Sequence, residues 1–160
     1  MIPTWLPALL NLDGNWEENL KVLYSIFETD FIQHQPEIDG IPVWHDRTIK
    51  EKPYPEGFWH VITKKEKITG DRVPDFRRAE RLPWCGPSLD NSDDPIIMKW
   101  DIEEDGGIKT YVWLENFDYV IILTNKLFRV GKVKFLTTAF YVTGDSIRNK
   151  LMKKYENRIL

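Results

Sequence analysis

Four consecutive strand patterns constrain the fold more than any other feature of this sequence. Ile96–Ile102 and Ile108–Leu114 have strand patterns, and the Asp105-Gly-Gly107 sequence between them is a strong signal for a hairpin turn. Tyr119–Thr124 is continuously apolar, as in a strand covered on both faces, and Phe135–Thr143 is a further strand. Strands that follow one another through short turns pair antiparallel, so we expect an antiparallel sheet here.

A helical pattern precedes the strands near the start of the chain. Asp13 or Asn15 can act as its N-cap, and acidic residues follow in the first turn, where the helix dipole favours them. The pattern continues to about His34, and Pro36 ends it. Its apolar residues recur at helical spacing on one face: Trp16, Leu20, Leu23, Tyr24, Phe27 and Phe31.

A second helical pattern closes the chain. Asp145 or Ser146 can cap it, and Ile147, Leu151 and Tyr155 share one side. The sequence therefore predicts an α+β fold, in which an antiparallel sheet of four to five strands is packed against N-terminal and C-terminal helices.

The region between the first helix and the strands has weaker signals. Ile41–His45 reads as a short extended piece, and Phe58–Thr63 reads as a strand because it is rich in aromatic and β-branched residues. Pro74 suits the first turn of a short helix that Pro83 ends, and Ser88–Pro95 reads as a polar loop. With 160 residues and no linker, the whole chain is expected to form one domain.

Composition excludes several classes of protein. The single cysteine, Cys85, rules out an internal disulfide framework and a cysteine-built zinc site. No apolar run approaches the roughly 20 residues that cross a bilayer. The first residues lack the basic region of a signal peptide and are interrupted by Pro3 and Pro7, so we do not expect a signal peptide. Phosphate-binding, dinucleotide-binding and zinc-protease motifs are absent. We therefore expect a cytoplasmic protein without a membrane association, a cofactor or a metal.

The net charge of −3 hides an uneven distribution of charge. Residues 1–40 carry one base and seven acids, a net −6, and residues 86–118 carry two bases and nine acids, a net −7. Residues 41–85 carry ten bases and seven acids, a net +3, and residues 119–160 carry nine bases and two acids, a net +7. Either the segments neutralise one another in the fold, or the two basic segments form a surface for an anionic partner such as RNA.

Three histidines are the clearest candidates for acid–base chemistry. His34 closes the first helix, where a cation is favourable. His45 and His60 lie in or beside short extended segments of the same basic stretch. A pair of imidazoles can cleave RNA, because one takes the proton of the ribose 2′-OH and the other protonates the departing 5′-oxygen. The alternative is that each is packed or exposed without a role.

Arginines and hydroxyls supply two further candidate groups. Arg72, Arg77, Arg78 and Arg81 lie within ten residues, and arginine's planar fork matches phosphate oxygens. Acidic neighbours, Asp75 and Glu80, could instead pair with these arginines on a solvated face. In the last strand, strict alternation places Thr137 and Tyr141 on the more polar face and Thr138 on the other. These threonines could equally serve the strand itself.

Several strings together resemble a known family. They are Trp16–Leu20, Phe58-Trp-His-Val-Ile62, Arg72–Trp84, Asn91–Pro95, Thr138-Ala-Phe-Tyr141 and Leu151–Tyr155. This set is similar to a family of small phage-associated bacterial proteins grouped with the barnase–EndoU–colicin–RelE-like nuclease superfamily. The resemblance spans residues 4 to 155 and implies helices packed on an antiparallel sheet, a metal-independent, toxin-like ribonuclease activity and a neutralising protein partner. The site that it implies is His45, His60, Arg78, Glu80, Arg81, Thr138 and Tyr141, which favours Thr138 over Thr137.

Two hypotheses follow. In the first, the protein is an endoribonuclease: His60 and His45 transfer protons, arginines 78 and 81 stabilise the phosphorane, and Thr138 and Tyr141 orient the phosphate. In the second, it is a non-catalytic RNA- or protein-binding module of a phage or mobile-element regulatory system, and the histidines have no catalytic role. The spacing of His45 and His60 in the folded chain bears on the choice.

Overall fold

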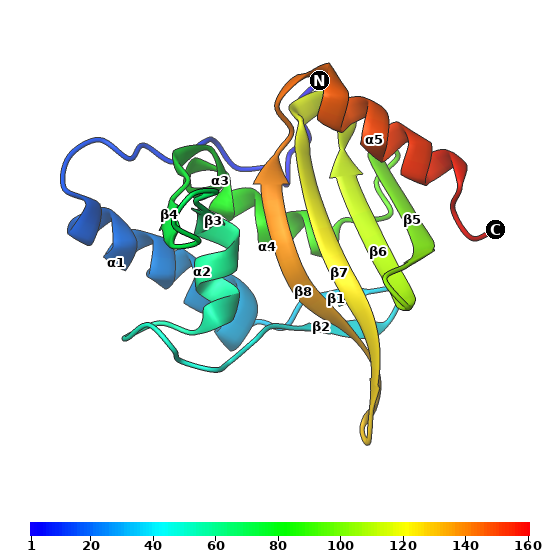
Figure 1. Ribbon diagram of the computed structural model, residues 1–160, viewed down its shortest axis with the longest axis horizontal. Coiled ribbons are helices and arrows are strands. Elements are labelled where there is room, and N and C mark those ends of the chain that lie inside the picture. Colours follow the sequence, from blue (N-terminus) through cyan, green and yellow to red (C-terminus); the bar gives the residue numbers. More distant parts are fainter.

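The consecutive strand patterns form an antiparallel meander in the computed structural model, which describes residues 1–160. Its strands are β5 (Ile97–Glu104), β6 (Gly107–Leu114), β7 (Tyr119–Phe128) and β8 (Gly131–Tyr141). Asp105 and Gly106 form the first turn with positive φ angles, which confirms the predicted hairpin. The β7–β8 hairpin continues past the other strands as a long arm (Figure 1).

The sheet is larger than predicted and is mixed. Two short strands, β1 (Glu37–Ile38) and β2 (Ile41–Trp44), extend it to six strands in the order β1-β2-β8-β7-β6-β5. β2 runs parallel to β8, with Trp44 opposite Phe135. The prediction of four to five antiparallel strands is therefore wrong in number and direction, because β2 joins the sheet through a pairing between distant parts of the chain.

Both terminal helices form, with one difference at their caps. α1 (Trp16–Phe27) continues into the π-helical η1 (Glu28–Gln33), and the Asn15 side chain caps it by accepting hydrogen bonds from two backbone N–H groups. α5 (Gly144–Glu156) begins after Thr143, so the predicted caps Asp145 and Ser146 lie inside its first turn instead. None of the helices is both long and apolar enough to cross a membrane.

The predicted strand over Phe58–Thr63 is wrong. Those residues belong to α2 (Glu56–Ile62), and only Thr63 is extended, as the first residue of β3 (Thr63–Lys65). Pro55 immediately precedes the helix and Glu56 lies in its first turn, both of which favour a helix start. Most of α2 is buried, so its sequence lacks the polar positions that would have revealed a helical period.

The arginine-rich segment forms one strand and two helices rather than a single helix. β4 (Arg72–Pro74) pairs with β3, α3 (Phe76–Glu80) follows, and α4 (Leu82–Asp90) comes next. Pro74 therefore ends a strand, and Pro83 lies in the first turn of α4 instead of ending a helix. Proline is tolerated there because first-turn N–H groups have no partner within the helix. α4 also takes up the first part of the predicted loop over Ser88–Pro95.

Two apolar clusters hold the sheet between helices. Val112 and Leu114 point into the larger cluster with buried residues of α1, α2 and α4, whereas Trp113 points to the opposite face. There it packs with Leu151 of α5. The alternation along β6 thus assigns α5 to one face of the sheet and the other helices to the other (Figure 1).

Candidate functional site

Residues of both basic segments meet in a hollow of about 430 Å³ where α2 packs on β8. We call it the His60 hollow. Residues 41–85 contribute Asp46, His60 and Arg72, and β7 and β8 contribute the other walls. Its polar lining residues are Asp46, His60, Arg72, Thr124, Lys126, Thr137 and Thr138. The fold therefore brings one histidine, two cations and three hydroxyls to one concave surface.

His60 is half-buried, and its side chain lines the hollow. It occupies the last turn of α2, and its imidazole makes no hydrogen bond within the protein, so its ring nitrogens remain available. Burial lowers the pKa of His60 below its usual value, and the positive charge of Arg72 lowers this pKa further. The neutral imidazole, which can accept a proton, is therefore favoured near neutral pH.

Asp46 lines the same hollow as His60 and acts on it as a carboxylate. Burial opposes its ionisation, but hydrogen bonds from Thr48 and the charges of Lys50 and His60 bring the pKa of Asp46 below its usual value. The backbone N–H of Thr48 donates to its Oδ1 over 2.9 Å. In turn, the negative charge of Asp46 favours the protonated form of His60. Asp46 can therefore stabilise an imidazolium that forms during a reaction.

A β-bulge brings two neighbouring threonines to the hollow. Ile122 lies opposite Thr138 and Leu123 lies opposite Leu136, so Thr137 is an extra residue in β8. The strict alternation assumed from the sequence therefore fails at this point, and both Thr137 and Thr138 line the His60 hollow. The Oγ1 of Thr137 lies 2.7 Å from that of Thr124 on β7. Both threonines thus remain candidates for contacting a phosphate.

Arg78 lies behind the hollow and supports it. One terminal nitrogen of its guanidinium donates to the carbonyl oxygens of His60 and Thr63, over 3.1 and 2.8 Å, and to the hydroxyl of Thr138 over 3.3 Å. Its Nε lies 3.2 Å from a carboxylate oxygen of Asp75. These contacts satisfy carbonyl groups at the end of α2 and tie the helix to β8. Arg78 is therefore placed to position His60 rather than to bind substrate.

Glu80, Arg81 and Tyr141 form a separate cluster. Arg81 is buried, its guanidinium lies 4.1 Å from the ring centre of Tyr141 and 5.3 Å from that of Trp84, and it donates to Glu80 over 2.6 Å. None of these three residues lines the His60 hollow. The structure therefore does not bring them together with His60, and their contacts are those of a packed ion pair between aromatic rings.

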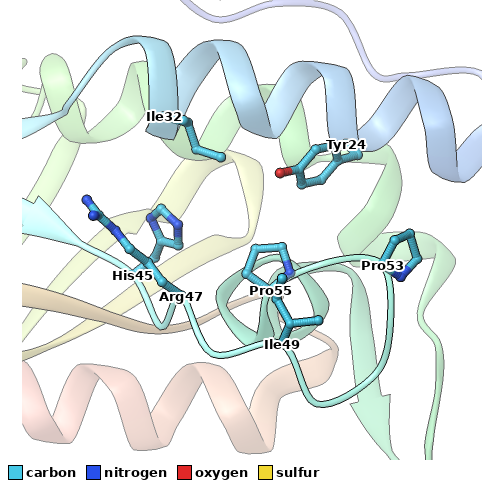
Figure 2. A pocket seen from close by; sticks show the side chains of 7 residues that line it. All are labelled: Tyr24, Ile32, His45, Arg47, Ile49, Pro53 and Pro55. Carbon is cyan, nitrogen blue, oxygen red and sulfur yellow. The ribbon is translucent and has the colours of Figure 1, made fainter.

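His45 lines a different hollow, of about 420 Å³, which we call the His45 hollow (Figure 2). Figure 2 shows His45 and Arg47 on one wall, Tyr24 and Ile32 on the helical wall opposite, and Ile49, Pro53 and Pro55 on the loop that closes it. His45 is only 6% exposed and packs edge-on against Phe27. Burial, assisted by the charge of Arg47, lowers the pKa of His45 to about 4, so its imidazole is neutral at pH 7. His45 and His60 line no common hollow.

The His60 hollow contains residues that were not among the site candidates from the sequence. Asp46, Thr124, Lys126 and Phe135 line it, and the Lys126 ammonium lies 4.2 Å from the ring centre of Phe135. The sequence distinguishes Arg72 only as one of four clustered arginines. The only signals in the sequence were that Asp46 follows His45 and that Lys126 lies in the more basic segment. Neither shows the long-range pairing of β2 with β8.

Comparison with protein-family models, with curated proteins and with solved structures found no match. The residues and geometry of the His60 hollow are therefore the basis for assigning a function.

Proposed function

We propose that this protein is an endoribonuclease that cleaves RNA by attack of a ribose 2′-OH on the neighbouring phosphodiester. One observation carries the proposal: His60, favoured in its neutral form, shares a hollow with Asp46, Arg72, Lys126 and threonine hydroxyls. The hollow thus combines a proton acceptor with cations and hydrogen-bond donors for a phosphate.

The proposed reaction uses His60 as general base. Its imidazole removes the 2′-OH proton, the 2′-oxygen forms a bond to phosphorus, and the bond from phosphorus to the 5′-oxygen breaks. The 5′-oxygen takes a proton from solvent, and the products are a 2′,3′-cyclic phosphate and a 5′-hydroxyl. Arg72 and Lys126 oppose the charge that develops on the phosphorane oxygens, while Asp46 stabilises the imidazolium. This assignment replaces the histidine pair with one histidine, because His45 belongs to the neighbouring hollow.

The test is cleavage of a mixed RNA pool by the purified chain, followed by His60→Gln. We expect wild-type protein to release fragments with cyclic phosphate ends and His60→Gln to lower the rate at least about 100-fold, the usual contribution of a general base. His34→Gln is the matched control, because His34 is exposed and paired with Asp90 outside the hollow. Equal cleavage by wild-type protein and His60→Gln would exclude the mechanism.

A second candidate function is RNA binding without cleavage, which one observation favours. The second imidazole of the expected pair lines another hollow, so no second histidine is placed to protonate the leaving oxygen. In that case the purified chain binds RNA through the same cations and leaves it intact, and Arg72→Gln weakens binding while His60→Gln does not.

A further inference from the structure

Two further hollows lie along the segment Trp44–Arg47, next to the His60 hollow. A hollow of about 300 Å³, here called the aromatic hollow, shares Asp46 and Phe135 with the His60 hollow. It also shares His45 and Arg47 with the His45 hollow. The three therefore follow one another in space, with the aromatic hollow in the middle.

We propose that these three hollows form one track for single-stranded RNA, in which a phosphate lies in the His60 hollow and unpaired bases occupy the other two. This inference rests on the proposed function and names its substrate class. A track of this kind combines cations that follow the backbone with aromatic faces on which bases stack.

The aromatic hollow supplies the stacking surface. Trp44 of β2 and Phe128 at the end of β7 stack on each other, with ring centres 5.2 Å apart and planes at 24°. Phe128 is nevertheless 40% exposed, so part of its ring is open to solvent. Phe135 borders the same hollow on the side of His60. A base next to the scissile phosphate can therefore stack on an existing aromatic pair.

The charges along the track match a nucleic acid backbone. Arg47, Arg72 and Lys126 line the three hollows, and Asp46 is the only carboxylate among their lining residues. The cations lie at successive points of the track, since Arg47 borders the His45 hollow and the aromatic hollow, whereas Arg72 and Lys126 border the His60 hollow. This excess of positive charge favours an anionic chain over a peptide without acidic residues.

The His45 hollow can receive a second base. Its walls are largely apolar, with the exposed side chains of Ile32 and Ile49 on opposite sides, and Arg47 lies beside the histidine (Figure 2). The neutral imidazole of His45 makes no hydrogen bond within the protein and offers one donor and one acceptor. It can therefore pair with the edge of a base, and base recognition explains a buried histidine that faces a hollow without any other polar partner.

The track is tested by binding, independently of cleavage. His60→Gln protein, which is not expected to cleave, is titrated into three fluorescein-labelled ligands, and anisotropy is measured. The ligands are a single-stranded RNA, the same RNA annealed to its complement, and an abasic strand of the same length. We expect the single strand to bind at least about five-fold more tightly than either of the other two, because only the single strand offers unpaired bases that can stack on the aromatic rings.

Phe128→Ala identifies the stacking surface, and Leu127→Ala is its control. Both residues lie on the exposed end of β7, but Leu127, which is 80% exposed, does not line the track. We expect Phe128→Ala to weaken single-strand binding at least about five-fold and to leave abasic binding unchanged, whereas Leu127→Ala changes neither. Circular dichroism checks that both variants are folded.

The outcomes separate the track from the proposed reaction. Three results would overturn the track: equal binding of the three RNAs, equal affinity of Phe128→Ala and Leu127→Ala, or no RNA binding at all. The last result would favour a protein ligand for the three hollows. Cleavage that depends on His60 but not on Phe128 supports the reaction and overturns the track. Single-strand binding that depends on Phe128, without any cleavage by wild-type protein, supports the track and overturns the reaction.

Discussion

Arg78 donates a hydrogen bond to the carbonyl oxygen of His60 over 3.1 Å, so the arginine predicted to bind phosphate holds the backbone of the proposed base. Its guanidinium also reaches Thr63 and Thr138 and is largely buried. We expect Arg78→Ala to lower the free energy of unfolding by about 2–4 kcal/mol, since it leaves buried carbonyls and Asp75 without their cation. Urea denaturation measures this change.

Arg77→Ala is the matched control for Arg78→Ala. Arg77 is the preceding residue of α3, but its side chain is exposed and pairs only with Glu80. Its removal is expected to change the free energy of unfolding by less than about 0.5 kcal/mol. Equal losses in the two variants would show that Arg78 does not anchor α2.

Arg72 is expected to control the protonation of His60. Burial lowers the pKa of His60, and Arg72 lowers it further because its positive charge opposes an imidazolium. Arg72→Gln removes that charge, so the pKa of His60 should rise towards 6.5, and the acid limb of any cleavage profile should move to higher pH. NMR titration of the His60 ring protons measures the pKa without requiring activity.

The control for this titration is Arg77→Gln. Arg77 is exposed, and it is not among the charges that act on His60. We expect the His60 titration to be the same in Arg77→Gln as in the wild-type protein. A fall in the His60 pKa on replacing Arg72, or no change, would contradict the electrostatic role given to Arg72.

Local signals in the sequence predicted some elements correctly. The Asp105-Gly-Gly107 turn and the Asn15 cap depend on residues a few positions apart, and both are confirmed. The helix over Phe58–Ile62 was predicted as a strand because its side chains are buried almost all round, which removes the amphipathic period. The parallel pairing of Trp44 with Phe135 joins residues 91 positions apart (135 − 44), which no local pattern encodes.

The candidate site could be predicted only in part for the same reason. His60 and Thr138 were identified as chemical groups, and both line the hollow. The bulge at Thr137 changes which face the following residues occupy, and a strict period of two cannot anticipate it. In sequence, Arg81 was indistinguishable from a phosphate-binding arginine, because its packing against Trp84 and Tyr141 beside Glu80 depends on the fold.

His45 is expected to make the protein less stable in mild acid. The pKa of His45 is about 4 in the folded chain and about 6.5 when unfolded, so between these values only the unfolded chain binds the proton. Above about pH 6.5 both states are neutral and His45 has no effect. As pH falls from about 6.5 to about 4, the free energy of unfolding should fall by up to about 1.4 kcal/mol per pH unit.

His45→Gln tests this source of acid sensitivity. Glutamine does not titrate, so the difference in the free energy of unfolding between wild-type protein and variant should shrink as pH falls below about 6.5. Urea denaturation at a series of pH values measures both proteins. If the two curves stay parallel from pH 7 to about pH 4.5, the imidazole is not held neutral by burial.

Gly57 is expected to be required for the close approach of α2 to the segment Trp44–Arg47, which lines the track. A Cβ added to Gly57 would lie 2.8 Å from the Cβ of His45 and 3.1 Å from the backbone nitrogen of Asp46. Alanine favours a helix by about 1 kcal/mol over glycine, but this contact requires backbone to move. We therefore expect Gly57→Ala to lower the free energy of unfolding by about 1–3 kcal/mol.

The same substitution should also weaken binding of single-stranded RNA, because His45 and Asp46 line adjacent hollows of the track. Gly107→Ala is the control: a Cβ there meets no atom within 4 Å, so neither stability nor RNA binding should change appreciably. Denaturation and anisotropy measurements on both variants decide the point. A Gly57→Ala protein as stable as the wild type, or more so, would mean that helix propensity outweighs the contact and that α2 does not fix the position of His45.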